Sequence, residues 1–409
     1  MTTLRLIGRR LWTTARLIRR AVPVPFGWHT RYMITSYCQH TFLVSCAVLT
    51  IALSIDSTVF LSKVLATIST WNVSWTAPYI TLYLGLRATD FLAELLPLVC
   101  FLGAFWTEIV HTLSQERLVV WLSGRAPWQC MMPALLFGLV VGSGQLVLNL
   151  YLRPDAVMML ARDHLGFYGE HFDPRPLPYP QWFAAGHDIV QAFVEPGDPA
   201  TLRDVKIYRL DESHSLRSFI RAQSAEPVDR NKWMLTDGYR WSASQGQDNP
   251  GFVWRDQKPP AASEQVPFAN EIIQFDLSPV WLNNNRIGAR YLTSDAFALL
   301  GKEDFSPVYE FRTWQRARWS IAVFCFAMPL FATSLSLVLL ANQLALVRLV
   351  AIAVAGYLAN TLMKVSVLLG EHGHVDPNIA AWLVPVLVLS ACGAIGLISR
   401  NGRSEGAAR

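Results

Sequence analysis

Five ionisable side chains stand inside long apolar runs, where a charge is costly and therefore points to a role. They are Asp56, Asp90, Glu94, Glu108 and Lys364. Asp90 and Glu94 are one helical turn apart, so they share one face of the predicted helix. Two interpretations are open: the charges pair between helices, for example Lys364 with a carboxylate, or they line an inner cavity that handles a charged, lipid-like substrate.

Catalytic motifs are absent from the sequence. It contains no GxxxxGK[ST], HExxH or GxSxG, so the chain cannot itself hold ATP phosphates in a P-loop. His372 and His374, with Glu371 and Asp376 beside them, could hold a metal ion, but a solvated polar loop is the commoner explanation for such a group. All six cysteines lie in apolar runs and are predicted to behave as small apolar residues, with no disulfide framework.

The amino-acid composition of the middle of the chain differs from that of its two ends. Of its 409 residues, 52% are hydrophobic and 16% are charged, whereas about a quarter of a soluble domain is charged. Acidic residues are concentrated in the middle of the chain, with 22 of the 30 between Asp155 and Glu310. We therefore predict a membrane α-helical protein with a soluble insert between its two membrane parts.

Six apolar runs reach the length of about 20 residues that a transmembrane helix needs. They cover approximately residues 37–65, 88–110, 128–152, 319–340, 349–369 and 379–398. The predicted divisions are a basic N-terminal segment (1–36), three helices (37–154) with a short helix at 114–125, the insert (155–311), three more helices (312–399) and a tail (400–409). In the third run, Gly138, Gly142 and Gly144 predict close packing against another helix.

Arginines set the predicted orientation. Seven arginines and no acidic residue occur among the first 31 residues, and Arg117, Arg125 and Arg348 occupy the two loops on the same side. Because basic loops stay in the cytoplasm, both termini and the 114–125 helix are predicted to be cytoplasmic and the insert external. The net charge of +5 is explained in this way and does not indicate nucleic-acid binding.

The insert is predicted to be mostly β. Apolar and polar residues alternate in DVKIYRL (204–210), KWMLTDGYRW (232–241) and EIIQFDL (271–277), which is the pattern of half-buried strands. Several short strands without helices between them favour a sandwich or jelly roll. SDAFALLG (294–301) is predicted to form a helix in the connector that returns to the membrane.

The stretch SQERLVVWLSGRAPWQ (114–129) predicts a short helix that is apolar on more than one face. Such a helix either lies flat against its own spans or is covered by a cytoplasmic partner. Its Glu116 followed by LVV, then Gly124 and Pro127, resembles the coupling segment of the lipopolysaccharide-export permeases LptF and LptG.

Other segments are similar to the same family, and together they cover nearly all of the chain after Arg31. They are ELLPLVCFLGAF (94–105), Asn149 with Pro154, GYLAN (356–360) and DPNIAAWLVP (376–385). In the insert, WFAAGHDIVQA (182–192) is more similar to LptG than to LptF.

The resemblance implies an ABC transporter permease in the inner membrane of a Gram-negative bacterium, with a periplasmic β-jellyroll insert, which extracts lipopolysaccharide and passes it toward the outer membrane. Its partners would be an LptF-type paralogue, an LptB-type ATPase dimer and bridge proteins of the LptC and LptA types. The chain would be non-catalytic and without a cofactor, because the ATPase binds ATP and Mg²⁺. Alternatives are an LptF-type subunit, a force-transmitting ABC permease and a membrane scaffold without a transport role, and a membrane enzyme ranks last.

The resemblance also assigns site residues. The ATPase would be contacted by Glu116, Leu118, Trp121 and Gly124. Candidates for holding the phosphates of the lipid are Lys63, Arg153, Arg162 and Lys364. Three positions depart from the family pattern, since Gln115 stands where Ser is usual, Arg117 replaces an aliphatic residue and Asp56 lies where a basic residue can occur.

Overall fold

A computed structural model describes residues 27–71, 75–122, 127–172, 179–185, 188–195, 197, 199–211, 216–229, 232–242, 265–275, 277–284, 287–300, 308–340 and 345–406. The basic residues 1–26 lie outside this part. The chain divides into two compact units. The helical unit takes residues up to 61, 84–153 and 312 onward, and the β unit takes residues 62–83 and 154–311.

Six helical stretches in the described part are long and apolar enough to cross a membrane, and each overlaps one of the predicted spans. They are Trp28–Thr70, Ala77–Leu113, Met132–Arg162, Tyr309–Leu339, Leu346–Glu371 and Pro377–Gly396. The predicted membrane-helical fold is thereby confirmed.

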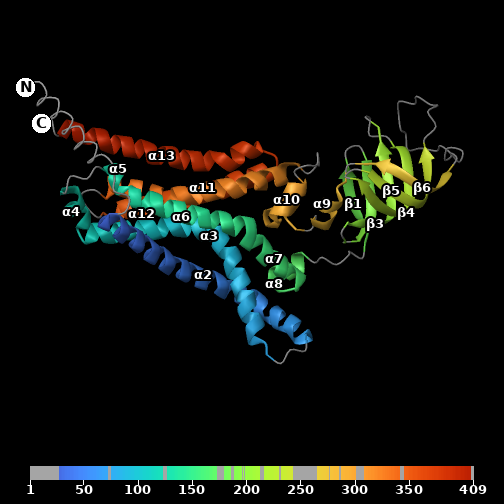
Figure 1. Cartoon of the computed structure of the whole chain (residues 1–409), viewed down its shortest axis with the longest axis horizontal. Coiled ribbons are helices and arrows are strands. Elements are labelled where there is room, and N and C mark those ends of the chain that lie inside the picture. The colour runs from blue at the N-terminus through green and yellow to red at the C-terminus, as the bar shows by residue number, and fades with distance from the viewer. Residues whose placement is uncertain are drawn as a thin grey trace, which may run out of the picture. The chain divides into compact units, whose positions relative to one another are not determined.

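The helices of these stretches are labelled in Figure 1. They are α2 (Trp28–Thr70), α3 (Ala77–Leu113), α6 (Met132–Val147), α11 (Val308–Leu339), α12 (Leu346–Glu371) and α13 (Pro377–Gly406). The third stretch continues from α6 through a π-helical turn, η1 (Leu148–Leu152), into α7 (Arg153–Arg162). Two short helices, α4 (Glu116–Leu122) and α5 (Pro127–Cys130), lie between α3 and α6 in the chain.

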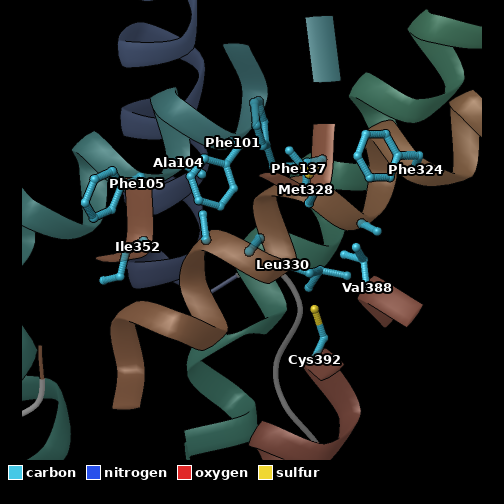
Figure 2. Packing of buried hydrophobic residues seen from close by; sticks show 14 of the residues in the cluster. Phe101, Ala104, Phe105, Phe137, Phe324, Met328, Leu330, Ile352, Val388 and Cys392 are labelled. Carbon is cyan, nitrogen blue, oxygen red and sulfur yellow. The ribbon is translucent and has the colours of Figure 1, made fainter. Parts of the chain in front are cut away.

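An apolar cluster holds the helical unit together. Figure 2 shows side chains from α3, α6, α11, α12 and α13 that meet in it: Phe101, Ala104, Phe105, Phe137, Phe324, Met328, Leu330, Ile352, Val388 and Cys392. From α2, Met33 and Tyr37 join the same cluster. Because lipid tails are as apolar as these side chains, close packing rather than transfer from water holds membrane helices together.

Two glycines let α6 approach α11 closely. A methyl group added at Gly138 would lie 2.5 Å from the carbonyl oxygen of Phe326, and one added at Gly142 would lie 3.0 Å from that of Ala322. At Gly144 no atom lies within 4 Å of the same position. The predicted helix contact is therefore confirmed for Gly138 and Gly142 and is wrong, within this chain, for Gly144.

The insert carries an antiparallel sheet whose described strands pair in chain order (Figure 1). The strands are β1 (Gln181–Ala185), β2 (Asp188–Glu195), β3 (Thr201–Leu210), β4 (Leu216–Asp229), β5 (Lys232–Ser242) and β6 (Val266–Gln274). The predicted β insert is confirmed, and its described strands form one sheet, whereas the sandwich or jellyroll arrangement stays a prediction. The third predicted strand, 271–277, ends earlier than expected, at Gln274.

One face of this sheet is buried and forms the core of the β unit. Residues that alternate along the strands point into it, such as Val190, Ile207 and Ile220. The indole Nε1 of Trp233 donates a hydrogen bond to the Leu277 carbonyl at 3.0 Å. Beyond the end of β6, Phe275 and Leu277 are buried in the same core.

The remaining elements of the β unit are short. They are α8 (Gly166–His171), α9 (Pro279–Asn284), the 3₁₀ turn η2 (Ala289–Tyr291) and α10 (Ser294–Leu300), of which α10 is the helix predicted in the connector. On the sheet, Arg221 donates to the Asp204 carboxylate at 3.1 and 3.2 Å. These hydrogen bonds raise the pKa of the Arg221 guanidinium above its ordinary value.

Replacing Gly138 or Gly142 by leucine should destabilise the helical unit, because the new side chain would meet the backbone of α11. Overpacking of this kind costs about 1–3 kcal/mol, so the melting temperature in detergent should fall. Gly144→Leu is the matched control, since it makes the same change on the same helix in open space. If all three variants had the same melting temperature, the packing described for α6 and α11 would be contradicted.

Candidate functional site

Charged side chains from four helices meet in a group that we name the Asp90 network. Its members are Asp56 of α2, Arg87, Asp90 and Glu94 of α3, Arg153 of α7 and Lys364 of α12. Four of the six are buried, whereas Glu94 and Lys364 are partly exposed.

The Asp90 carboxylate stands at the centre of this network. It accepts hydrogen bonds from Arg153 Nε at 2.9 Å and from Arg87 Nη1 at 3.2 Å. Arg87 Nε also donates to Asp56 at 3.0 Å. On the other side, Arg153 Nη2 lies 3.7 Å from Glu94, which accepts a hydrogen bond from Lys364 Nζ at 3.0 Å. Alternating charges thus connect α2, α3, α7 and α12.

Charge balance permits the burial of this group. Its three carboxylates match its three cations, and a buried charge that loses its partner is strongly destabilising. Arg318 of α11 is a further buried cation, and Arg153 repels it.

The predicted pairing of Lys364 with a carboxylate is confirmed. The predicted common face of Asp90 and Glu94 is confirmed too, because Arg153 contacts both.

The π-helical turn η1 brings Arg153 into the Asp90 network. Gln145 of α6 donates from Nε2 to the Ala93 carbonyl of α3 at 2.7 Å, so this face of the third span lies against α3. In an unbroken α-helix, Arg153 would point about 80° away from Gln145. The extra residue of a π turn cancels most of that rotation, and Arg153 returns to the same face.

The four predicted lipid-binding residues fall into two groups. Arg153 is buried inside the Asp90 network, and Lys364 belongs to the same network with about half of its side chain exposed. Lys63 on α2 and Arg162 at the end of α7 are exposed and belong to the β unit. For all four, contact with a lipid stays a prediction.

A second buried group, the Glu108 network, lies about 27 Å further along α3 from Asp90. The hydroxyl of Tyr37, on α2, donates to the Glu108 carboxylate at 2.5 Å. The guanidinium of Arg117, on α4, pairs with the same carboxylate and donates from Nη1 to the Ser336 carbonyl of α11 at 3.0 Å. Arg117, one of the departures from the family pattern, is only 5% exposed.

Glu116, predicted to contact an ATPase, has partners within its own chain. Its carboxylate accepts a hydrogen bond from the Tyr32 hydroxyl at 3.2 Å and lies 2.8 Å from His111 Nδ1. The side chain nevertheless stays 42% exposed. Glu116 therefore lies at the surface, and its contacts with Tyr32 and His111 hold it against its own helix bundle.

The outer face of α4 is apolar and exposed. Leu118, Val119 and Leu122 are 53%, 67% and 78% exposed. The side chain of Trp121 and the whole of Gly124 lie outside the described residues. The described part of α4 thus has one face bound to its own bundle and one apolar face open to a partner.

A cavity of about 20 Å³ lies beside the Glu108 network, lined in part by His29, His111, Arg117 and Thr333. That volume has room for one water molecule. It cannot hold a lipid chain or a nucleotide.

The histidine pair of the GEHGH loop shows no metal arrangement. The rings of His372 and His374 are stacked 6.4 Å apart, and the Glu371 carboxylate accepts a hydrogen bond from Trp314 Nε1. Within the described residues, no group of three His, Cys, Asp or Glu side chains is placed to bind a metal ion.

Sequence reasoning did not predict that Arg87 and Arg117 are the partners of buried carboxylates. A signal existed for Arg87, which precedes Asp90 at the i,i+3 spacing of a helical ion pair. For Arg117 the sequence offers no such signal, because its partner Glu108 lies on a different helix.

Within the described residues, six helices long and apolar enough to cross a membrane, with a β insert between the third and the fourth, define a multi-pass membrane protein. The sequence profile described as "Lipopolysaccharide export system permease LptF/LptG" matches residues 31–399. The chain therefore belongs to this family and is a multi-pass protein of the inner membrane. The profile covers LptF and LptG together and does not distinguish them. No curated protein matches the chain.

Asp90→Asn should destabilise the helical unit strongly, because it leaves two buried arginines without a full counter-charge. Breaking a buried ion pair from one side costs about 3–5 kcal/mol, which a thermal melt in detergent would detect. Glu94→Gln is the control, because it neutralises a partly exposed carboxylate of the same network and leaves Asp90 paired with both arginines. If Asp90→Asn melted like the wild type, the Asp90 network would have no role in holding the helices.

Proposed function

We propose that this chain is the LptG-type permease subunit of an ATP-driven exporter of lipopolysaccharide. It pairs with an LptF-type paralogue and with two copies of an LptB-type ATPase, which binds the ATP and Mg²⁺. The complex extracts lipopolysaccharide from the inner membrane, and the β unit passes it to bridge proteins of the LptC and LptA types. The choice of LptG over LptF rests on the segment 182–192 and its resemblance to LptG.

The exposed apolar face of α4 is the observation that supports ATPase docking best. Leu118, Val119 and Leu122 form a continuous apolar edge on a short helix whose other face is held by Arg117. An apolar helix face that fits a groove of a partner is a common mode of recognition. Glu116 at the start of the helix adds a charge that can select the partner.

The distribution of arginines supports the proposed orientation. Arg348, at the start of α12, donates to the Leu339 carbonyl near the end of α11 and is exposed, so it lies in the loop on the α4 side of the bundle. The arginines of the N-terminal segment belong to the same side by the positive-inside rule. In this orientation both termini and α4 are cytoplasmic and the β unit is periplasmic.

Exposed cations and open strand edges support the proposed handling of a lipid. Lys63 and Arg162 are exposed and Lys364 is half exposed, so all three can approach the phosphates of a lipid headgroup. In the described sheet β1 and β6 each pair with one neighbour, which leaves edges to which a strand of a bridge protein can add.

The proposal is tested by purifying the chain in detergent from cells that co-express its candidate partners, and by identifying bound proteins and lipids with mass spectrometry. A similar permease, an ATPase and retained lipopolysaccharide are the expected partners. Val119→Asp should reduce the retained ATPase about tenfold or more, because it places a charge in the apolar contact. Val347→Asp makes the same change on α12 at a position that is 80% exposed, and this variant should retain the ATPase. Recovery without any ATPase would contradict the function, and equal recovery for both variants would contradict docking on α4.

Glu116→Ala should uncouple the complex while leaving its expression intact. Truncating one partner of an interfacial charge pair commonly costs 2–5 kcal/mol, so lipid-stimulated ATP hydrolysis and export should each fall by about tenfold or more. The measurement is made on the reconstituted complex, with Ser114→Ala as the neighbouring exposed control. Unchanged activity of the Glu116 variant would exclude the predicted contact.

A further inference from the structure

We propose that Arg117 is a positioning residue that fixes α4 to the helix bundle, so that movement of α4 is transmitted to α3 and α11. The proposal rests on the function proposed above, in which an ATPase docks on the exposed face of α4. It assigns a role to the arginine that stands where the family pattern has an aliphatic residue.

The helix α4 cannot hold its position by itself. It has seven residues, or about 10 Å of helix, and helices of that length are not stable in isolation. The turn before it is sharp, because Gln115 has a left-handed φ of 57°. The orientation of α4 therefore depends on side chains that reach from it to neighbouring helices.

Arg117 provides the buried connection. Among the described side chains of α4 it alone is buried, and it binds Glu108 on α3 and the Ser336 carbonyl on α11. Glu108 also accepts a hydrogen bond from Tyr37 of α2, whose hydroxyl lies 3.4 Å from Thr333 Oγ1 on α11. One side chain of α4 is thus connected to three spans.

The chemistry of this connection suits the transmission of movement. A guanidinium presents its donors in a rigid fork, so two simultaneous contacts fix the direction of α4 as well as its distance from the bundle. An apolar contact would let the helix slide or rotate at little cost. The cavity beside Arg117 has room for only one water molecule, so the guanidinium cannot swing aside without moving its neighbours.

The polar contacts of Glu116 are weaker than those of Arg117. Its carboxylate pairs with His111 and accepts a hydrogen bond from Tyr32, but it is 42% exposed, and exposed pairs contribute little to stability. Arg117 is therefore the described polar side chain of α4 that connects it most firmly to the bundle.

The test measures the lipid exported per ATP hydrolysed by the whole complex of this chain, its paralogue and the ATPase, reconstituted in proteoliposomes with a soluble periplasmic acceptor protein. Arg117→Met and Glu108→Gln should each lower this ratio about tenfold. The double variant should be no worse than the worse single variant, because all three remove the same link.

Arg348→Met is the matched control. Its guanidinium also donates to a carbonyl near the end of α11, that of Leu339 at 3.1 Å, but it does not lie on α4. The ratio of export to hydrolysis should be unchanged in this variant.

The double variant keeps the test valid if a single variant misfolds, because it leaves neither member of the pair as an uncompensated buried charge. Its melting temperature and its bound ATPase should match the wild type while its ratio stays low. A double variant that binds ATPase and exports at the wild-type ratio would overturn the proposal. A double variant whose ratio falls by the product of the two single-variant losses would overturn it too. A wild-type chain that recruits no ATPase would instead overturn the proposed function.

Discussion

A charge buried among membrane helices is tolerated only beside an opposite charge, and this requirement determines how the helices of the bundle pack. Asp90 can lie on α3 because Arg87 and Arg153 reach it, so the third span must present Arg153 to α3. A regular helix would not do so in the register set by Gln145. The π turn η1 changes the direction in which the following residues of the third span point, so that Arg153 faces Asp90.

The helix α3 belongs to both charge networks, which gives it a central place in the bundle. Asp90 and Glu94 bind α2, α7 and α12, whereas Glu108 binds α2 and α4, about 27 Å away. Between the two networks the bundle is packed by apolar side chains such as Phe101 and Phe105 (Figure 2). Packed cores move between discrete arrangements rather than deform continuously. A rotation of α4 would therefore act first on Glu108 and on the part of α3 that carries it.

Spans and strands could be predicted because they depend on local composition: the length of an apolar run or the alternation along a strand. The pairing of Lys364 with a carboxylate could be predicted because few charges lie inside the spans, but only the structure identifies Glu94 as the partner. The pairing of Asp56 with Arg87 could not be predicted, since it depends on how α2 and α3 are rotated relative to each other. For the same reason the sequence places Arg117 in a cytoplasmic loop, although its contacts are with buried groups of the helix bundle.

The contacts of Glu116 within its own chain bear on how a partner is recognised. An ionised carboxylate has about four acceptor sites, and the described contacts use two of them, for Tyr32 and His111. A cationic side chain of an ATPase can therefore bind Glu116 without breaking either contact. Because these contacts already hold the carboxylate, less side-chain freedom is lost when a partner binds. Because Arg117 also holds α4 to the bundle, the proposed docking surface is preorganised rather than a flexible loop.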